Sequence, residues 1–522
     1  MIQFVSENMA PLMFAGMILF MLIGYPAAFS LAAVGLFFGF IGIELGLIRA
    51  DFLGNLTYQL YGIISNDLLL AIPFFTFMGA ILERCGLAED LLDSIGQMFG
   101  PVRGGLSYAV IFVGAILGAI TGTVAASVIA MGVISVPVML KYGYSTRHTM
   151  GVIAASGTIT QLIPPSLVLV VLADQLGRSV GDMYAGAIGP SIIQVALFCV
   201  WVLIVSILKP KDVPALPLEA RTLKGWALWG KCLRGIIPSL GLIFLVLGTI
   251  FMGLATPTEA GAMGAVGSLA LAVFNRSLSW PGRIRLALAD ARTLHAASTA
   301  VSPLAIGVRE LWRRSTPVIA PDFKELGQLI YQGMATTMRI TAMVVYILIG
   351  ARTFSLVFQG VGGKEWIEHM LTSLPGGQLG FLVFVNVFIF VIAFFLDFFE
   401  IAFIIIPLLA PAASKLGIDL IWFGVLVCAN IQTSFMHPPF GFALFYLRGI
   451  APPSVKTSDI YWGAIPWVVL QVILVAIVIL WPGSVTYWID RGTQVDPSKI
   501  NIEIPQIELP PPLDFSEPPK MQ

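Results

Sequence analysis

Charged residues are scarce in this chain of 522 residues, because Asp, Glu, Lys and Arg together make up only 11% of it. An ordinary soluble domain carries about 25%, so a soluble protein of this size would lack the polar surface that it needs. The 29 basic and 29 acidic residues cancel, which excludes a protein held to nucleic acid by a strong positive charge. Hydrophobic residues make up 57% of the chain, and this composition indicates a polytopic membrane protein.

Cysteine, histidine and catalytic motifs are also sparse. The four cysteines, Cys85, Cys199, Cys232 and Cys428, have no paired spacing, so neither a disulfide framework nor a zinc site is indicated. No Walker, HExxH or GxSxG sequence stands in a suitable context and the four histidines are scattered, so we do not expect an enzyme. No Lys or Arg precedes Arg49, and we therefore expect no cleaved signal peptide.

Long apolar runs predict about ten full membrane spans. They lie near 9–24, 26–45, 68–84, 148–174, 183–208, 236–254, 258–275, 335–357, 420–447 and 461–482. Two further apolar stretches, 106–140 and 379–414, are too long for one span and are interrupted midway by small or polar residues, so we expect helical hairpins that enter and leave on one face. The loops of one side then carry about 20 of the 29 Lys and Arg residues. The positive-inside rule makes that side cytoplasmic and predicts that both termini are periplasmic.

The two halves of the chain resemble each other. A shift of 274 residues places Pro137 on Pro411 and the pair Pro164-Pro165 on Pro438-Pro439, without a gap over about 80 positions. An odd number of spans separates equivalent points, so the halves have opposite orientations. The predicted fold is therefore all-α, with inverted repeats of five spans each, two re-entrant helical hairpins and two broken helices. Such repeats are typical of secondary transporters, whose binding site lies near the membrane midplane.

Four segments at membrane depth combine helix-breaking and polar residues: 120–127, 155–166, 396–400 and 430–439. A double proline removes two backbone donors and should break its span. Freed backbone groups are tolerated at this depth only inside protein or beside a watery cavity. The segments thus predict a site where amides and hydroxyls could hold an anion and carbonyl oxygens a hard cation. Taken singly, a Pro-Pro pair can be a simple kink, and a Ser or Thr can bond back to its own helix.

Asp397 and Glu400 are the acids that we place near a hairpin tip. Intramembrane acids are functional by default, but these two could instead sit at an aqueous mouth and cap the following half-helix. His437 could titrate or donate to a substrate, or it could simply pack at the break. Arg339 and Arg352 could neutralise a substrate, although snorkelling to an interface is the simpler interpretation.

Several motifs together resemble the large membrane subunit of tripartite ATP-independent periplasmic (TRAP) transporters. They are Ile72-Pro73-Phe74-Phe75-Thr76-Phe77-Met78-Gly79, the tip Gly118–Ser127, Ile163-Pro164-Pro165-Ser166, Ala255-Thr256-Pro257-Thr258-Glu259-Ala260-Gly261 and Pro438-Pro439-Phe440-Gly441. The resemblance covers roughly 10–275 and 322–485. It implies a secondary transporter of a bacterial inner membrane that imports organic acids, driven by a cation gradient, usually sodium. It also implies two partners, a small four-helix membrane subunit and a periplasmic substrate-binding protein, and an elevator-like movement of a transport domain.

Carried over by position, the resemblance implies a substrate and ion site at the two tips and two breaks. The implied residues are Thr121, Gly122, Thr123, Ser127, Gly157, Thr158, Thr160, Gln161, Pro164, Pro165, Asp397, Glu400, Asn430, Gln432, Thr433, Ser434, His437, Pro438 and Pro439. Sodium would be held by carbonyl and hydroxyl oxygens near Thr123, Thr158, Asp397 and Gln432, and no other cofactor is implied. The second tip, Leu-Asp-Phe-Phe-Glu, and His437 depart from the family pattern, so the solute and the ion stoichiometry stay open.

The predicted organisation alternates scaffold and transport segments. We expect scaffold spans and an arm in 1–67, a first transport half in 68–182, further scaffold spans in 183–275, a second transport half in 322–448 and a last span in 461–482. The insertion 276–321 carries seven arginines against two acids; we expect a solvated cytoplasmic loop, with binding of anionic lipid head groups as the alternative. The tail 483–522, rich in proline and acids, should be extended.

Other functions remain open at this stage. The first alternative is a sodium–dicarboxylate symporter of related fold that works without partners. A channel or an integral-membrane enzyme belongs to a different class, but a channel would show no saturable, cation-dependent uptake. An enzyme would need a cluster of catalytic or metal-binding side chains, which the scattered histidines do not supply.

Overall fold

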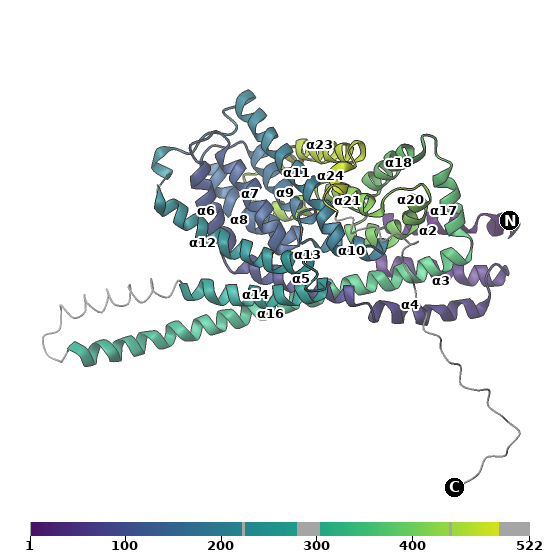
Figure 1. Cartoon of the computed structure of the whole chain (residues 1–522), viewed down its shortest axis with the longest axis horizontal. Coiled ribbons are helices and arrows are strands. Elements are labelled where there is room, and N and C mark those ends of the chain that lie inside the picture. Colours follow the sequence, from purple (N-terminus) through teal and green to yellow (C-terminus); the bar gives the residue numbers. More distant parts are fainter. Residues whose placement is uncertain (1, 222–224, 279–302, 438–440, 490–522) are drawn as a thin grey trace, which may run out of the picture. The chain divides into compact units, whose positions relative to one another are not determined.

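The computed structural model describes residues 2–221, 225–278, 303–437 and 441–489. In these ranges every regular element is a helix (Figure 1). Seven helices are long and apolar enough to cross a membrane, or up to nine if each bent pair is one span. The prediction of an all-α polytopic membrane protein is confirmed. The inverted orientation of the two halves stays a prediction.

The chain begins with six α-helices and one short 3-10 helix. They are α1 (Ile2–Glu7), α2 (Met9–Leu22), α3 (Ala27–Glu44), the short 3-10 helix η1 (Ala50–Gly54), α4 (Asn55–Ile64), α5 (Asp67–Arg84) and α6 (Leu87–Phe99). A bend of 47° separates Ala50–Ile64 from α5, and the Asn66 side chain accepts a hydrogen bond from Leu68 N at the start of α5. This cap satisfies one of the backbone donors that a helix start leaves free.

The first predicted hairpin is a pair of helices, α7 (Gly105–Thr121) and α8 (Val124–Lys141). The break in the following span separates α9 (Thr146–Thr158) and η2 (Ile159–Gln161) from α10 (Leu167–Leu176). After it come α11 (Val180–Leu208), η3 (Leu218–Ala220), α12 (Trp226–Ile243), the π-helical turn η4 (Phe244–Gly248), α13 (Thr249–Phe251) and α14 (Pro257–Leu278). Both interruptions lie inside the segments that the sequence picks out.

The second half repeats this order. Helix α17 (Gly363–Thr372) turns by 117° into α18 (Gly377–Ile392). The hairpin continues through α19 (Phe398–Glu400), the π-helical turn η5 (Ile401–Ile405) and α20 (Ile406–Lys415). The second broken span consists of α21 (Leu420–Ile431), η6 (Gln432–Met436) and α22 (Phe442–Ile450), and α23 (Thr457–Leu480) and α24 (Gly483–Thr486) follow.

Helix α16 differs from the expectation. It runs unbroken from Pro303 to Gly360 over 58 residues, so the predicted loop is wrong for 303–321, which is helical. Alanine, leucine, glutamate and arginine in this stretch are good helix formers, and the helix runs without a break into the apolar stretch Leu326–Gly360. The rest of the insertion up to residue 302, apart from the end of α14, and the tail from residue 490 lie outside the described residues.

Small residues allow two pairs of helices to pack closely. Helix α3 packs on α16, where a Cβ on Gly350 would lie 2.3 Å from the backbone oxygen of Ala28. Helix α14 packs on α5, where a Cβ on Gly264 would lie 2.6 Å from Sδ of Met78. Glycine removes the side chain that would hold such backbones apart. The first pair joins a helix of the first half of the chain to one of the second half.

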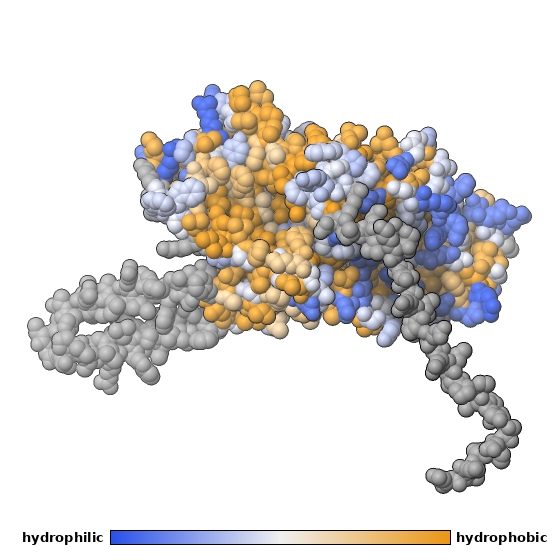
Figure 2. Space-filling model, viewed as in Figure 1, coloured by the Kyte–Doolittle hydropathy of each residue, from blue (hydrophilic) through white to orange (hydrophobic). Residues whose placement is uncertain are grey.

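The visible surface is dominated by hydrophobic residues (Figure 2). Large exposed apolar side chains include Ile207 and Leu208 on α11, which are 68% and 74% exposed, and Leu480 on α23. A soluble monomer rarely exposes contiguous apolar areas of this kind, whereas lipid tails solvate them without penalty. The surface therefore supports a location in the membrane.

Candidate functional site

The first hairpin tip turns at Gly122. Helix α7 ends there with φ of +62°, a conformation that strains any residue with a side chain and suits glycine. The next helix begins at Val124, so Thr123 is the one extended residue of the turn, with φ of −129° and ψ of 132°. Gly122 and Thr123 are half-buried, and the side chain of Thr121 lies outside the described ones. The tip thus presents backbone groups and one hydroxyl.

The first hairpin rests directly on the first break. The hydroxyl of Thr160 lies 3.1 Å from Ser127 Oγ on α8 and donates to the carbonyl of Gly157 at 2.7 Å. A Cβ on Gly157 would lie 2.2 Å from Cγ2 of Val128. A Cβ on Gly118 would lie 2.9 Å from the Cα of Thr160. The glycines therefore set how close the hairpin comes to the broken span.

The first break frees a carbonyl that the protein satisfies again. Ser166 donates to the carbonyl of Gln161 and accepts a hydrogen bond from Val168 N at 3.2 Å. The thiol of Cys428, on the second broken span, lies 3.3 Å from the same carbonyl. Oε1 of Gln161 is buried and has no hydrogen-bond partner in the part of the chain that the structure describes. The break therefore has one satisfied and one unsatisfied polar group, and an unpaired buried amide oxygen is costly unless a ligand occupies it.

The prolines of this break lie between η2 and α10. A cis peptide bond joins Pro164 and Pro165, and both are buried. Pro164 lines a cavity of about 510 Å³ together with Ser191 and Cys199 of α11 and Leu247 of η4. The predicted helix break is present, and it opens beside this largely apolar cavity. Pro438 and Pro439 of the second break lie outside the described residues.

Asp397 and Glu400 form a capping box at the second hairpin tip. Oδ1 of Asp397 accepts from Glu400 N at 2.9 Å, and Oε2 of Glu400 accepts from Asp397 N at 3.0 Å. Each acid thus satisfies a backbone donor at the start of the half-helix. Both are half-buried. Of the two interpretations of these acids, capping is present in the structure, and ion binding by their remaining oxygens stays a prediction.

The second break is tied to the second hairpin by asparagines. Nδ2 of Asn430 donates to the backbone oxygen of Asn386 at 2.8 Å and lies 3.0 Å from its Oδ1. Thr433 donates to the carbonyl of Asn430 at 2.8 Å, a bond back to its own helix. Ser434 is also buried. Asn386 lies on α18, so an amide pair fixes this break to its hairpin, whereas hydroxyls do so in the first half.

His437 packs between two phenylalanines. Its ring centroid lies 4.5 Å from that of Phe390 and 4.1 Å from that of Phe394. The side chain is 2% exposed, and among the described residues neither ring nitrogen has a hydrogen-bond partner. Of the interpretations of this residue, packing at the break is present in the structure, and titration or donation to a substrate stays a prediction.

The two breaks meet inside the protein. The hydroxyl of Thr158, at the end of α9, lies 3.7 Å from Sδ of Met436, at the end of η6. Together with the contact between Cys428 and Gln161, this pair joins the predicted residues of the first half to those of the second. Every described side chain among Thr158, Thr160, Gln161, Asn430 and Gln432 is buried. The sequence-predicted breaks therefore form one contiguous polar region.

Two glutamines of this region are missing from the sequence prediction. Gln194 on α11 donates to Oε1 of Gln432 at 2.6 Å, and Gln471 on α23 donates to the hydroxyl of Thr158 at 3.0 Å. Each helix follows the broken span of its own half and contacts the break of the other half. A lone glutamine inside an otherwise apolar span was the available signal.

The donors available to a cation are oxygens. Among the described residues, no group of three or more His, Cys, Asp and Glu side chains could hold a metal ion. The region around Thr158 and Gln432 offers hydroxyl, amide and carbonyl oxygens, the donors that hard cations prefer. The donor set therefore fits an alkali cation and does not resemble a transition-metal site.

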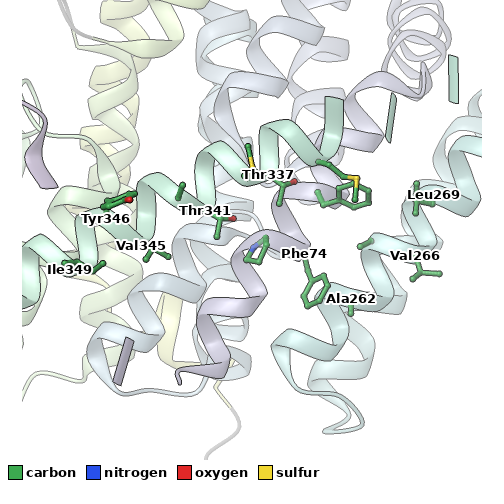
Figure 3. A pocket seen from close by; sticks show the side chains of 15 residues that line it. Phe74, Ala262, Val266, Leu269, Thr337, Thr341, Val345, Tyr346 and Ile349 are labelled. Carbon is green, nitrogen blue, oxygen red and sulfur yellow. The ribbon is translucent and has the colours of Figure 1, made fainter. Parts of the chain in front are cut away.

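A larger hollow lies away from the breaks. An apolar groove of about 920 Å³ is bounded by Phe74 of α5, Val266 of α14 and Tyr346 of α16 (Figure 3). Thr337 and Thr341 supply its few polar atoms. None of the predicted site residues lines it, so this groove does not coincide with the polar region.

Comparison with known proteins places the chain in a family. A family model described as the tripartite ATP-independent periplasmic transporter, DctM component, matches residues 14–484. The C4-dicarboxylate TRAP transporter large permease protein DctM of Vibrio cholerae is 29% identical, over 91% of this chain and 96% of its own. The ectoine TRAP transporter large permease protein TeaC of Halomonas elongata is 26% identical, over 91% of this chain and 97% of its own. The sialic acid TRAP transporter large permease protein SiaM of Vibrio cholerae is 24% identical, over 88% and 93%.

A solved structure supports the fold. The crystal structure of the Alcanivorax borkumensis YdaH transporter superposes with a TM-score of 0.51 at 16% identity, over 82% of this chain and 87% of that chain. The relatives are permease subunits of transporters and not enzymes. The apolar spans, the paired breaks and the near full-length family match agree, and this chain belongs to the DctM family as the large membrane subunit of a TRAP transporter.

Proposed function

We propose that this subunit imports an organic acid across a bacterial inner membrane, driven by a cation gradient, with sodium as the coupling ion. The relatives are named for C4-dicarboxylates, ectoine and sialic acid, solutes that carry carboxylate groups. The observation that carries the proposal is the meeting of the two breaks through Thr158 and Met436 and through Gln161 and Cys428. Polar groups from both halves thereby converge where the helices are interrupted.

The transport step requires no covalent chemistry. A solute leaves water only if fixed dipoles replace its hydration shell. The ends of interrupted helices supply partial charges of both signs, and the amide of Gln161 supplies an unpaired oxygen. We infer that sodium binds near Thr123, Thr158, Asp397 and Gln432 and that the carboxylate binds to hydroxyls and backbone amides between the two tips.

The proposed movement is of the elevator type. The hairpins and broken spans are bonded to each other through Ser127 and Thr160 in one half and through Asn386 and Asn430 in the other. Such bonds support movement of each hairpin together with its break. We propose a small four-helix membrane subunit and a periplasmic binding protein as partners, with both termini of this chain on the periplasmic side.

The experiment is uptake into proteoliposomes that contain this chain, its small subunit and its binding protein. The binding protein is first screened with C4-dicarboxylates, ectoine and sialic acid. Saturable uptake that requires both an inward sodium gradient and the binding protein supports the proposal. Gln161→Ala should abolish this uptake, whereas Gln97→Ala, at a half-buried position of α6 outside the two breaks, should leave it unchanged. Uptake by this chain without its partners would support the stand-alone symporter instead. Uptake at the same rate with and without a sodium gradient would contradict coupling to sodium.

A further inference from the structure

A polar pocket lies at the ends of three helices, away from the two breaks. It has a volume of about 540 Å³ and lies where α9 begins, α11 ends and α23 begins. Its charged side chains are Arg147, Lys209, Asp212 and Asp459. The turn after α11 is fixed, because Asp212 N donates to the carbonyl of Lys209 and Ser145 N donates to the carbonyl of Asp212, each at 2.9 Å. The pocket is thus a formed cavity with ordered walls.

The charges of the pocket balance. Arg147 donates to Asp459 at 2.9 Å, so this pair is satisfied within the protein. Lys209 and Asp212 also line the pocket. Among the residues that the structure describes, neither is part of an ion pair, so they offer one positive and one negative group to a ligand. A site for an anionic lipid would carry an excess of basic residues. A balanced pair instead fits a ligand that carries a phosphate and an ammonium group.

Apolar surface borders the pocket on two helices. Trp201, Val205 and Lys209 of α11 line it, and the neighbouring stripe of the same helix exposes Val200, Ile204 and Leu208. On α23, Trp462 lines the pocket and is 61% exposed. Tryptophan is enriched at the boundary between head groups and hydrocarbon. The polar cavity therefore continues into surface that suits acyl chains.

We propose that this pocket binds the head group of a zwitterionic, amine-bearing phospholipid of the phosphatidylethanolamine type. Lys209 and the outer edge of Arg147 contact the phosphate, Asp212 accepts from the ammonium group, and the acyl chains lie along α11 and α23. A soluble phosphorylated amine would use the same charges but would gain nothing from the exposed apolar stripes. The lipid joins α9, which carries the first break, to α11 and α23, which carry Gln194 and Gln471.

The test uses the full chain in nanodiscs with equal amounts of phosphatidylethanolamine and phosphatidylglycerol. After mild delipidation, native mass spectrometry counts the retained lipid. We expect one phosphatidylethanolamine per chain, with the apparent affinity lowered about tenfold in Lys209→Ala and in Asp212→Asn. Lys211→Ala is the matched control, because Lys211 is exposed beside the pocket but does not line it. Melting of each variant in detergent verifies that the fold is kept.

Three outcomes would overturn the proposal. They are equal retention in Lys209→Ala and Lys211→Ala, preferential retention of phosphatidylglycerol, and release of the lipid by millimolar glycerophosphoethanolamine, which would indicate a site for a soluble solute. Should both single variants lose their fold, Trp462→Ala replaces them, since an exposed side chain is removed without disturbing the core. The lipid count does not depend on transport. A failure of the lipid proposal is therefore distinguishable from a failure of the proposed function.

Discussion

Gln471 on α23 donates a hydrogen bond of 3.0 Å to the hydroxyl of Thr158, at the point where the first broken span leaves the helical conformation. The other half contains a matching pair, because Gln194 on α11 donates to Gln432 at 2.6 Å. Both donor side chains are fully buried, and Oε1 of each has no hydrogen-bond partner within the described ranges. The two amides therefore orient the residues at the breaks from outside the breaks themselves.

Removing one of these amides should weaken the fold and the transport together. In Gln471→Leu, the hydroxyl of Thr158 loses its donor, and we expect a loss of about 0.6–2 kcal/mol, the range for side-chain hydrogen bonds within membranes. A double-mutant cycle with Thr158→Val, measured by unfolding in mixed detergent, should return a coupling energy of this size. A coupling energy near zero would show that the bond does not stabilise the protein. Gln97→Leu, at a half-buried position of α6 outside the two breaks, serves as the control.

The first hairpin contacts the first break so closely that an added methyl group at Gly157 should not fit. A Cβ on Gly157 would lie 2.2 Å from Cγ2 of Val128, so Gly157→Ala should push α8 away, with a loss of about 1–3 kcal/mol and of uptake. The double variant with Val128→Ala should recover most of both, since it removes the clashing atom. Gly62→Ala, in α4, has nothing within 4 Å of the new Cβ and should be neutral or slightly stabilising. If Val128→Ala does not restore stability and uptake to Gly157→Ala, the loss does not come from this clash.

The charge of Asp397 can be separated from its role as a helix cap. Asparagine caps a helix about as well as aspartate, so Asp397→Asn should keep the melting temperature close to that of the unmodified protein. If the remaining carboxylate oxygen helps to hold sodium, the sodium concentration for half-maximal uptake should rise about tenfold or more. Asp397→Ala should in addition lower the stability by about 1 kcal/mol. An unchanged sodium dependence in Asp397→Asn would leave capping as the sole role of this acid.

His437 should be replaceable by an apolar ring. The stacking with Phe394 at 4.1 Å and the unpartnered ring nitrogens predict that His437→Phe keeps uptake within about twofold and leaves its pH profile between about pH 6 and 8 unchanged. By contrast, His437→Asp buries a charge between two phenyl rings and should prevent stable folding. A flattened or shifted pH profile in His437→Phe would instead indicate that the imidazole exchanges protons during transport.

Local sequence features predicted the elements of the site. Glycine at 122 and the double proline at 164 and 165 act on their own backbone, through allowed dihedrals and missing donors, so the turn and the break are found where the sequence places them. The same local reasoning predicts the hairpin tip at 396–400 and the break at 430–439 in the second half. The continuous helix α16 was not predicted, because a run of good helix formers and an arginine-rich loop have nearly the same composition.

The sequence by itself determined that this chain lies in a membrane, that it is all-helical, and that its helices are interrupted at four places, because scarce charge, apolar length and backbone chemistry are local properties. Only the tertiary structure decided which side chains meet. The hydrogen bonds of Gln194 and Gln471 each join residues more than 200 positions apart. The packing of His437 against two phenylalanines and the contact between Val128 and Gly157 depend on which helix faces meet. Such contacts depend on the orientation of whole helices, which no single segment of the chain specifies.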